Sequence, residues 1–98
     1  MANHSTFELE VLGFVAADYE APHTIAGDIA RELQRPTTEA EVLAALLALA
    51  RTGMVQSYVY DSGGSRYRPI TPQKAASAKE PWFMATAAGK TEREGHAN

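Results

Sequence analysis

The hydrophobic positions follow a helical period in the first half of the chain and a strand period after residue 55. Residues 5–20 open with a capping-box pattern, because Ser5 can accept a backbone N–H and Glu8 can reach back to the start of a helix. Residues 21–23 supply a break. We therefore predict a first helix over 5–20. Its apolar face consists of Phe7, Val11, Leu12, Phe14, Val15 and Tyr19.

A second, shorter helix is predicted over residues 25–35. Thr24 can cap its start, and Pro36 ends it, since the residue before a proline is disfavoured in a helix. Its apolar stripe consists of Ile25, Ile29 and Leu33.

The third helix, over about 38–52, has the clearest boundaries. Thr38 and Glu41 form another capping box, and Gly53 stands where a left-handed residue commonly ends a helix. The buried row of this helix is Val42, Leu46 and Leu49.

Strand signals follow. Residues 56–61 are rich in β-branched and aromatic side chains, the run SGGS favours a turn, and residues 66–70 can pair back as a hairpin with Pro69 on an edge. The polar, proline-flanked stretch 71–81 predicts a loop or mobile tip, and WFMAT a final strand. The chain then predicts a turn, a short helix and a frayed tail over 94–98. We expect one α+β domain over 1–98, ordered over about 5–93.

The composition, with 45% hydrophobic and 21% charged residues, is that of a globular protein. No apolar run reaches the roughly eighteen residues of a membrane span, and the first ten residues lack the features of a signal peptide, so we expect a cytoplasmic protein without a membrane partner. The chain has no cysteine, and its three histidines are far apart, which predicts no metal or cofactor. No nucleophile elbow or paired carboxylates suggest an enzyme.

Gly89-Lys90-Thr91 is similar to the end of a phosphate-binding loop. Such a loop needs a glycine five residues before the Gly-Lys pair, and that position is Met84. The chain is also too short for a nucleotide-binding sheet. The sequence therefore does not predict a nucleotide site.

The order of elements, with the segments LLALARTGMV and WFMATAAGK, resembles a winged helix-turn-helix domain of the kind found in PadR and MarR bacterial regulators. The resemblance covers about residues 5–93. It implies a wing over about 56–86 with a flexible tip over 62–80, and a DNA-binding transcriptional regulator acting as a homodimer. In this family the third helix lies in the major groove of double-stranded DNA. The groove-facing positions would be Thr37, Thr38, Glu39, Ala40, Glu41, Ala44, Ala45 and Ala48.

The charge distribution favours a role for the wing. The net charge is -3, yet the segment 62–79 holds four basic residues and no acid. These are Arg66, Arg68, Lys74 and Lys79. We expect them to contact phosphates, with Arg35 and Lys90 adding positioning contacts. Cross-strand packing is the interpretation favoured for Tyr58, Tyr60 and Tyr67.

An alternative is a winged helix that serves protein association. The third helix starts with Glu39 and Glu41, which repel phosphate and can instead stabilise the helix start, and its groove face has no Arg, Lys, Asn or Gln for base recognition. Apolar residues outside the main core rows could form a helix-packing surface. These are Leu43 and Leu47 in the third helix and Leu9, Leu12 and Ala16 in the first. A homodimer would use the first helix and the carboxyl-terminal segment. The sequence identifies neither an operator nor a small-molecule effector.

Overall fold

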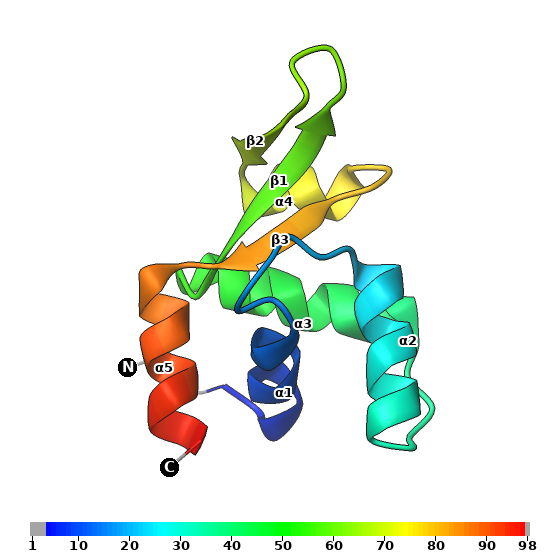
Figure 1. Ribbon diagram of the computed structural model, residues 1–98, viewed down its shortest axis with the longest axis vertical. Helices are drawn as coiled ribbons and strands as arrows, with labels where there is room; N and C mark the ends of the chain where they lie inside the picture. The colour runs from blue at the N-terminus through cyan, green and yellow to red at the C-terminus, as the bar shows by residue number, and fades with distance from the viewer. Residues whose placement is uncertain (1–3, 98) are drawn as a thin grey trace.

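A computed structural model describes residues 4–97, and its backbone forms five helices and a three-stranded antiparallel sheet (Figure 1). The α+β class predicted from the sequence is confirmed. In chain order the elements are α1 (Thr6–Phe14), α2 (Pro22–Glu32), α3 (Glu39–Arg51), β1 (Val55–Asp61), β2 (Arg66–Ile70), α4 (Pro72–Ser77), β3 (Trp82–Ala85) and α5 (Ala87–Ala97).

Helix α1 has the predicted start and an earlier end. The Ser5 hydroxyl accepts from the Glu8 N–H at 3.1 Å, and the Glu8 carboxylate accepts from the Ser5 N–H at 3.0 Å, so the capping box is complete. The prediction that the helix continues to about residue 20 is wrong. The backbone of Val15 and Glu20 pairs instead with β3: the Val15 carbonyl accepts from Ala85, and Glu20 exchanges two hydrogen bonds with Phe83. Strand pairing thus takes the backbone groups that a longer helix would have used.

Helix α2 begins earlier than predicted. Pro22 occupies its first turn, where the missing N–H costs nothing, and Thr24 lies inside the helix rather than capping it. Ile25 and Ile29 are fully buried as expected. Leu33 is not part of the buried stripe, because the helix ends at Glu32 and leaves the leucine 44% exposed.

Helix α3 confirms most of its predicted features. The Thr38 hydroxyl accepts from the Glu41 N–H at 3.1 Å, and Gly53 has the expected positive φ of 79°. The capping box is only half formed, since the Glu41 carboxylate accepts from the Thr38 hydroxyl and not from its backbone N–H. The predicted row, Val42, Leu46 and Leu49, is fully buried.

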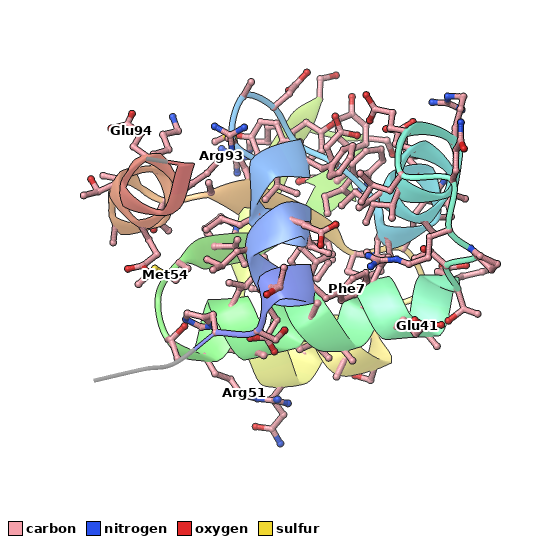
Figure 2. The ribbon with its side chains drawn as sticks, turned by 90° about the horizontal axis from the view of Figure 1, so that it is seen from below. Phe7, Glu41, Arg51, Met54, Arg93 and Glu94 are labelled. Atoms are coloured by element: carbon pink, nitrogen blue, oxygen red, sulfur yellow. The ribbon has the colours of Figure 1, made fainter. Side chains whose placement is uncertain are left out.

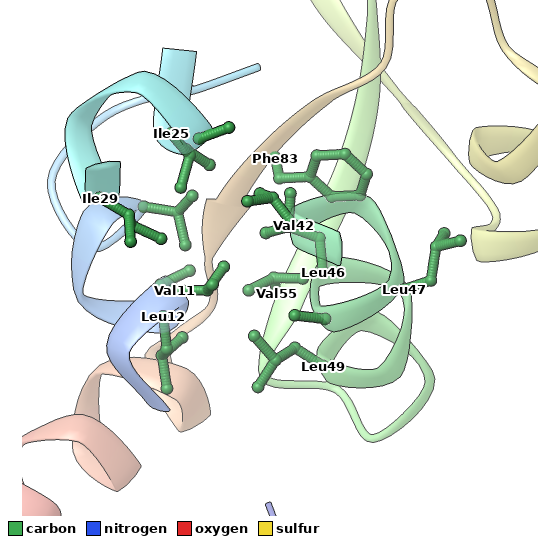
Figure 3. Packing of buried hydrophobic residues seen from close by; sticks show 14 of the residues in the cluster. Val11, Leu12, Ile25, Ile29, Val42, Leu46, Leu47, Leu49, Val55 and Phe83 are labelled. Carbon is green, nitrogen blue, oxygen red and sulfur yellow. The ribbon is translucent and has the colours of Figure 1, made fainter. Parts of the chain in front are cut away.

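These rows meet in one core. Figure 3 shows Val11 and Leu12 of α1 facing α3, with Ile25 and Ile29 of α2 beside them and Phe83 of β3 above. Leu12, expected in a second row that a small monomer would leave partly uncovered, is fully buried, while Leu9 and Ala16 are half-buried. The buried Ser57 hydroxyl donates to the Ile70 carbonyl at 2.8 Å, so this polar group is satisfied.

The sheet has the order β2-β1-β3. Strands β1 and β2 form the predicted hairpin, with Tyr60 opposite Tyr67 and a short turn over 62–65. Strand β3 pairs with the other edge of β1, where Tyr58 lies opposite Trp82. The hairpin projects from the helical part of the molecule in Figure 1.

Most of the segment 62–80, predicted as the tip of the wing, is regular structure, and the loop predicted over 71–81 is wrong for residues 72–77. Residues 66–70 are strand and 72–77 are helix α4, whose N-cap Thr71 accepts from the Lys74 N–H at 3.2 Å. Ala75 is fully buried, and α4 contacts both α3 and β1. A cap, a proline in the first turn and one small residue that fits against α3 turn a polar stretch into a packed helix.

The carboxyl-terminal segment is also more regular than predicted. Residues 94–97, predicted as part of a frayed tail, belong to helix α5, and residue 98 lies outside the described residues. The Thr86 hydroxyl accepts from the Gly89 N–H at 3.1 Å and donates to the Gly53 carbonyl at 2.6 Å. Thr86 therefore caps α5 and ties it to the end of α3.

Candidate nucleic-acid interface

The positions predicted to contact DNA lie in four places in the structure. One group is on the β1–β2 hairpin and α4, a second is at the start of α3, and two single residues lie elsewhere. The first group comprises Arg66, Arg68 and Lys74, the second comprises Thr37, Thr38, Glu39, Ala40, Glu41, Ala44 and Ala45, and the single residues are Arg35 and Lys90.

The hairpin has two chemically different faces. Successive residues of a strand point to opposite sides of the sheet, so Arg66, Arg68 and Ile70 share one face and Tyr67 lies on the other. The arginine face continues toward α4. Arg68 and Lys74 line a groove of about 590 Å³ between β2 and α4, together with Val59, Pro69, Ile70, Thr71, Pro72 and Gln56.

Electrostatics make this groove basic. The Arg68 guanidinium lies 4.0 Å from the Asp61 carboxylate, and its side chain remains 61% exposed, so the pair is loose. Arg66 and Lys74 are exposed and form no salt bridge with the side chains described. Arg68 and Lys74 line the groove, and Arg66 lies outside its lining on the same face of β2, opposite Asp61. We define the basic groove as Arg66, Arg68, Lys74 and the surface between β2 and α4.

Lys74 lines this groove from a structural element that was not predicted from the sequence. It was expected on a mobile tip but lies in α4, as the predicted loop is a helix. Lys79 follows α4 and is exposed.

The start of α3 is exposed but poor in suitable side chains. Thr38, Glu39, Ala40, Glu41 and Ala44 are exposed, whereas Thr37 and Ala48 are half-buried. Ala45 was expected to face the DNA groove; this is wrong, because only 4% of its surface is exposed and it packs in the core. Glu8 and Glu41 line a depression of about 300 Å³ beside this part of α3, which makes the surroundings acidic.

Packing also restricts access to the rest of α3. The helix lies between α1 and α4 (Figure 2). Leu47, expected outside the main core row, is 8% exposed and points away from the other labelled core residues in Figure 3, toward the side where α4 lies. Leu43 is half-buried against the core. Helix α4 therefore covers much of the surface that the sequence suggested for a partner helix.

Arg35 is engaged within the protein. Its guanidinium lies 3.3 Å from the Glu10 carboxylate of α1 and 5.3 Å from the centre of the Phe7 ring. These contacts fasten the α2–α3 connection to α1. Lys90 is exposed on α5, which lies beside α1 and away from the hairpin tip (Figure 1). Neither residue joins the basic groove.

The opposite face of the hairpin carries an aromatic face, which we define as Tyr19, Tyr58, Tyr60, Tyr67 and Trp82. Tyr67 is its centre: its ring stacks on Tyr19 with 3.8 Å between centroids, and it meets Tyr60 at 5.1 Å and Trp82 at 5.5 Å edge to face. The expected cross-strand packing of the hairpin tyrosines is confirmed. Partial burial, followed by the negative charge of Asp18, raises the pKa of Tyr67.

Tyr19 and Trp82 belong to this face, although no pattern in the sequence indicates it. Tyr19 was assigned to the first helix, and a residue in a loop has no periodicity that would reveal its direction. The separation of arginines from tyrosines was visible, however, in the alternation Arg66-Tyr67-Arg68.

The chain matches no family model, no curated protein and no solved structure with which it was compared. Among the described residues, no helix is long and apolar enough to cross a membrane.

Proposed function

We propose that this protein is a DNA-binding transcriptional regulator of the winged-helix type, in which the β1–β2 hairpin is the wing. Three helices followed by an antiparallel hairpin are compatible with such a layout. The isolated pairing of Glu20 with Phe83 adds a bridge between the α1–α2 connection and the sheet.

The observation that carries this proposal is the gathering of Arg68 and Lys74 in one groove, with Arg66 further along the same face. Phosphate contacts by lysine and arginine supply most of the sequence-independent affinity for DNA. A groove formed by a strand and a short helix gives the phosphate backbone a concave surface with cations on both sides.

Helix α3 has a smaller part in this proposal than in a typical winged helix. Its exposed first turns offer Thr38, Ala40 and Ala44, which can approach thymine methyl groups, while Glu39 and Glu41 can accept only from cytosine. Base recognition by this surface is limited, and phosphate contacts dominate the expected affinity.

Titration of a labelled random-sequence duplex, followed by fluorescence anisotropy at several salt concentrations, tests the proposal. Arg66→Ala/Arg68→Ala should reduce the slope of log K against log salt by roughly two, since each phosphate contact contributes about 0.9. Arg31→Ala/Arg51→Ala is the matched control: it removes the same charge from exposed positions on α2 and α3 and should leave the slope nearly unchanged. Equal slopes for both double variants would refute the groove as the DNA contact.

A second candidate function is a winged-helix module for protein association with little DNA binding. The acidic depression beside α3, lined by Glu8 and Glu41, favours it, because this surface repels phosphate. Absence of duplex binding by the unmodified protein, even at low salt, would support this alternative.

A homodimer is part of the main proposal, since two-fold DNA sites are read by dimers. The surface considered for it is a groove along α1 that is bordered by the end of α2 and by α5. Phe14 and the exposed Leu33 line a groove of about 340 Å³ there, with Gly13, Glu10, Glu32 and Arg93 at its sides. Helix α1 and the carboxyl-terminal segment thus both border this surface.

A further inference from the structure

The aromatic face lies on the side of the sheet away from α3 and α4. The alternating register places Ser57 and Phe83 toward the core and Tyr58 and Trp82 on the other side. Tyr60 is 48% exposed, and the other four rings are half-buried, so the face presents ring surface to its surroundings. Aromatic side chains of this kind are enriched at protein interfaces.

Acidic groups border the aromatic face. Asp18 and Glu20 flank Tyr19 in the α1–α2 connection, and the negative charge of Asp28 in α2 repels that of Glu20. Burial, followed by the charges of Asp28 and Asp18, raises the pKa of Glu20. Asp28 is paired with Arg31, whereas the side chains described provide no salt-bridge partner for Asp18 or Glu20. Two carboxylates without a salt-bridge partner therefore lie next to the half-buried Tyr19 at the border of the aromatic face.

Aromatic rings beside carboxylates favour binding of an arginine side chain. A guanidinium group can stack on a ring through cation–π attraction and donate hydrogen bonds in its plane to a carboxylate, which an ammonium group does less well. Phosphate is disfavoured, because Asp18 and Glu20 would repel it. We propose that the aromatic face docks an arginine-bearing segment of a partner protein.

The proposed docking does not rest on DNA binding, because the basic groove lies on the other face of the hairpin. Each surface can be tested while the other is intact. The two functions are compatible in one molecule, as a partner on the aromatic face would leave Arg66 and Arg68 accessible.

Trp82 is the only tryptophan of the chain and belongs to the aromatic face, so its emission reports binding there directly. The full chain is titrated with the peptide Gly-Arg-Gly-Arg-Gly-Arg-Gly and, separately, with the corresponding lysine peptide. We expect a saturable change in Trp82 emission with the arginine peptide and weaker binding of the lysine peptide. Tyr60→Ala should weaken arginine-peptide binding about two- to fivefold, the usual share of one exposed cation–π contact.

A second variant tests the carboxylates without disturbing the packing of the rings. Asp18→Asn/Glu20→Gln keeps all five rings and should also weaken binding, whereas Glu92→Gln/Glu94→Gln removes the same charge from exposed positions on α5 and should not. Circular dichroism establishes that each variant is folded.

Five results would overturn the proposal. The first two are the absence of a saturable change in Trp82 emission at millimolar arginine peptide and equal affinity for the arginine and lysine peptides. The third is arginine-peptide affinity that neither Tyr60→Ala nor Asp18→Asn/Glu20→Gln alters. The fourth is a change in Trp82 emission with protein concentration alone that Arg66→Ala/Arg68→Ala abolishes, which would mean that a second copy of the chain occupies the face. Oligothymidylate that alters Trp82 emission in the unmodified protein but not in Tyr60→Ala would instead identify a base-stacking surface.

Discussion

Gly89 of α5 lies against the carbonyl oxygen of Met54, so closely that a β-carbon at position 89 would come within 1.9 Å of that oxygen. The same carbonyl accepts from the Thr86 N–H at 3.0 Å, which fixes the start of α5 beside the end of α3. The glycine that suggested a phosphate-binding loop has a structural role here: it permits close approach between two backbones.

Replacement of this glycine should therefore be costly. Gly89→Ala should destabilise the protein by about 1–3 kcal/mol, because the backbone of α5 or of Met54 must shift. Chemical denaturation measures the difference. Gly95→Ala is the control in the same helix: nothing lies within 4 Å of an added β-carbon, so it should be neutral or stabilise by up to about 1 kcal/mol. Equal stability of both variants would contradict the close packing of α5.

Two substitutions in α4 distinguish a packed helix from a mobile loop. Ala75 is fully buried, whereas Ala76 is exposed. Ala75→Leu should cost about 1–3 kcal/mol through overpacking, and Ala76→Leu should change stability by no more than about 0.5 kcal/mol. Thermal unfolding of both variants gives the comparison. If segment 71–81 were a loop in solution, the two substitutions would be equivalent.

The dimer proposed above depends on Leu33. Leu33→Glu places a charge in the apolar groove beside Phe14 and should shift the protein toward monomer by at least tenfold in dissociation constant, measured by analytical ultracentrifugation. Since Leu33 is 44% exposed, the monomer itself should remain folded. Tyr60→Glu is a control at another exposed apolar side chain and should leave a dimer of this geometry intact.

Local signals were the predictable part of this fold. The caps at Ser5 and Thr38 and the left-handed Gly53 depend only on nearby residues, so the starts of α1 and α3 and the end of α3 follow from the sequence. The end of α1 was not predictable in this way, because Val15 and Glu20 pair with a strand that lies more than sixty residues later. Helix α4 escaped for a similar reason: only contact with α3 makes Ala75 a core residue.

The residues of the candidate site also differ in whether local sequence or distant contacts determine their positions. Alternation along β2 places Arg66 and Arg68 together from sequence alone. Lys74 joins them only because α4 folds beside the strand, and the partners of Arg35 on α1 lie 25 residues or more away in the chain. Contacts between distant segments are therefore what the sequence interpretation lacked.

Substitution of Arg35 tests whether this residue has a structural role or contacts DNA. As a structural residue it pairs with Glu10 and lies over Phe7, so Arg35→Ala should lower the free energy of unfolding by about 1 kcal/mol. Its removal should leave the salt dependence of duplex binding unchanged, unlike removal of Arg66 and Arg68. A double-mutant cycle with Glu10→Gln isolates the ion pair. A reduced salt slope with unchanged stability would restore Arg35 as a DNA contact.

Glu20 should make stability depend on pH. Burial and the charges of Asp28 and Asp18 raise its pKa above the ordinary value of 4.5, so the folded protein binds a proton at this carboxyl more tightly than the unfolded chain does. The stabilisation from the protonated group is complete below the ordinary value and is lost as pH rises through the raised pKa. Glu20→Gln lacks this loss, and at neutral pH it should be more stable than the unmodified protein by less than about 1 kcal/mol.

Urea denaturation from pH 3 to pH 8 would follow this difference. The advantage of Glu20→Gln should disappear toward the acidic end, because both side chains are then neutral. Glu92→Gln, at an exposed position on α5, removes the same charge from outside the acidic cluster and should give a nearly constant difference. A Glu20→Gln variant that is less stable at neutral pH would mean that the carboxylate is stabilised in the folded protein, which contradicts the repulsion by Asp18 and Asp28. The acidic border of the aromatic face would then have a cationic partner within the protein itself.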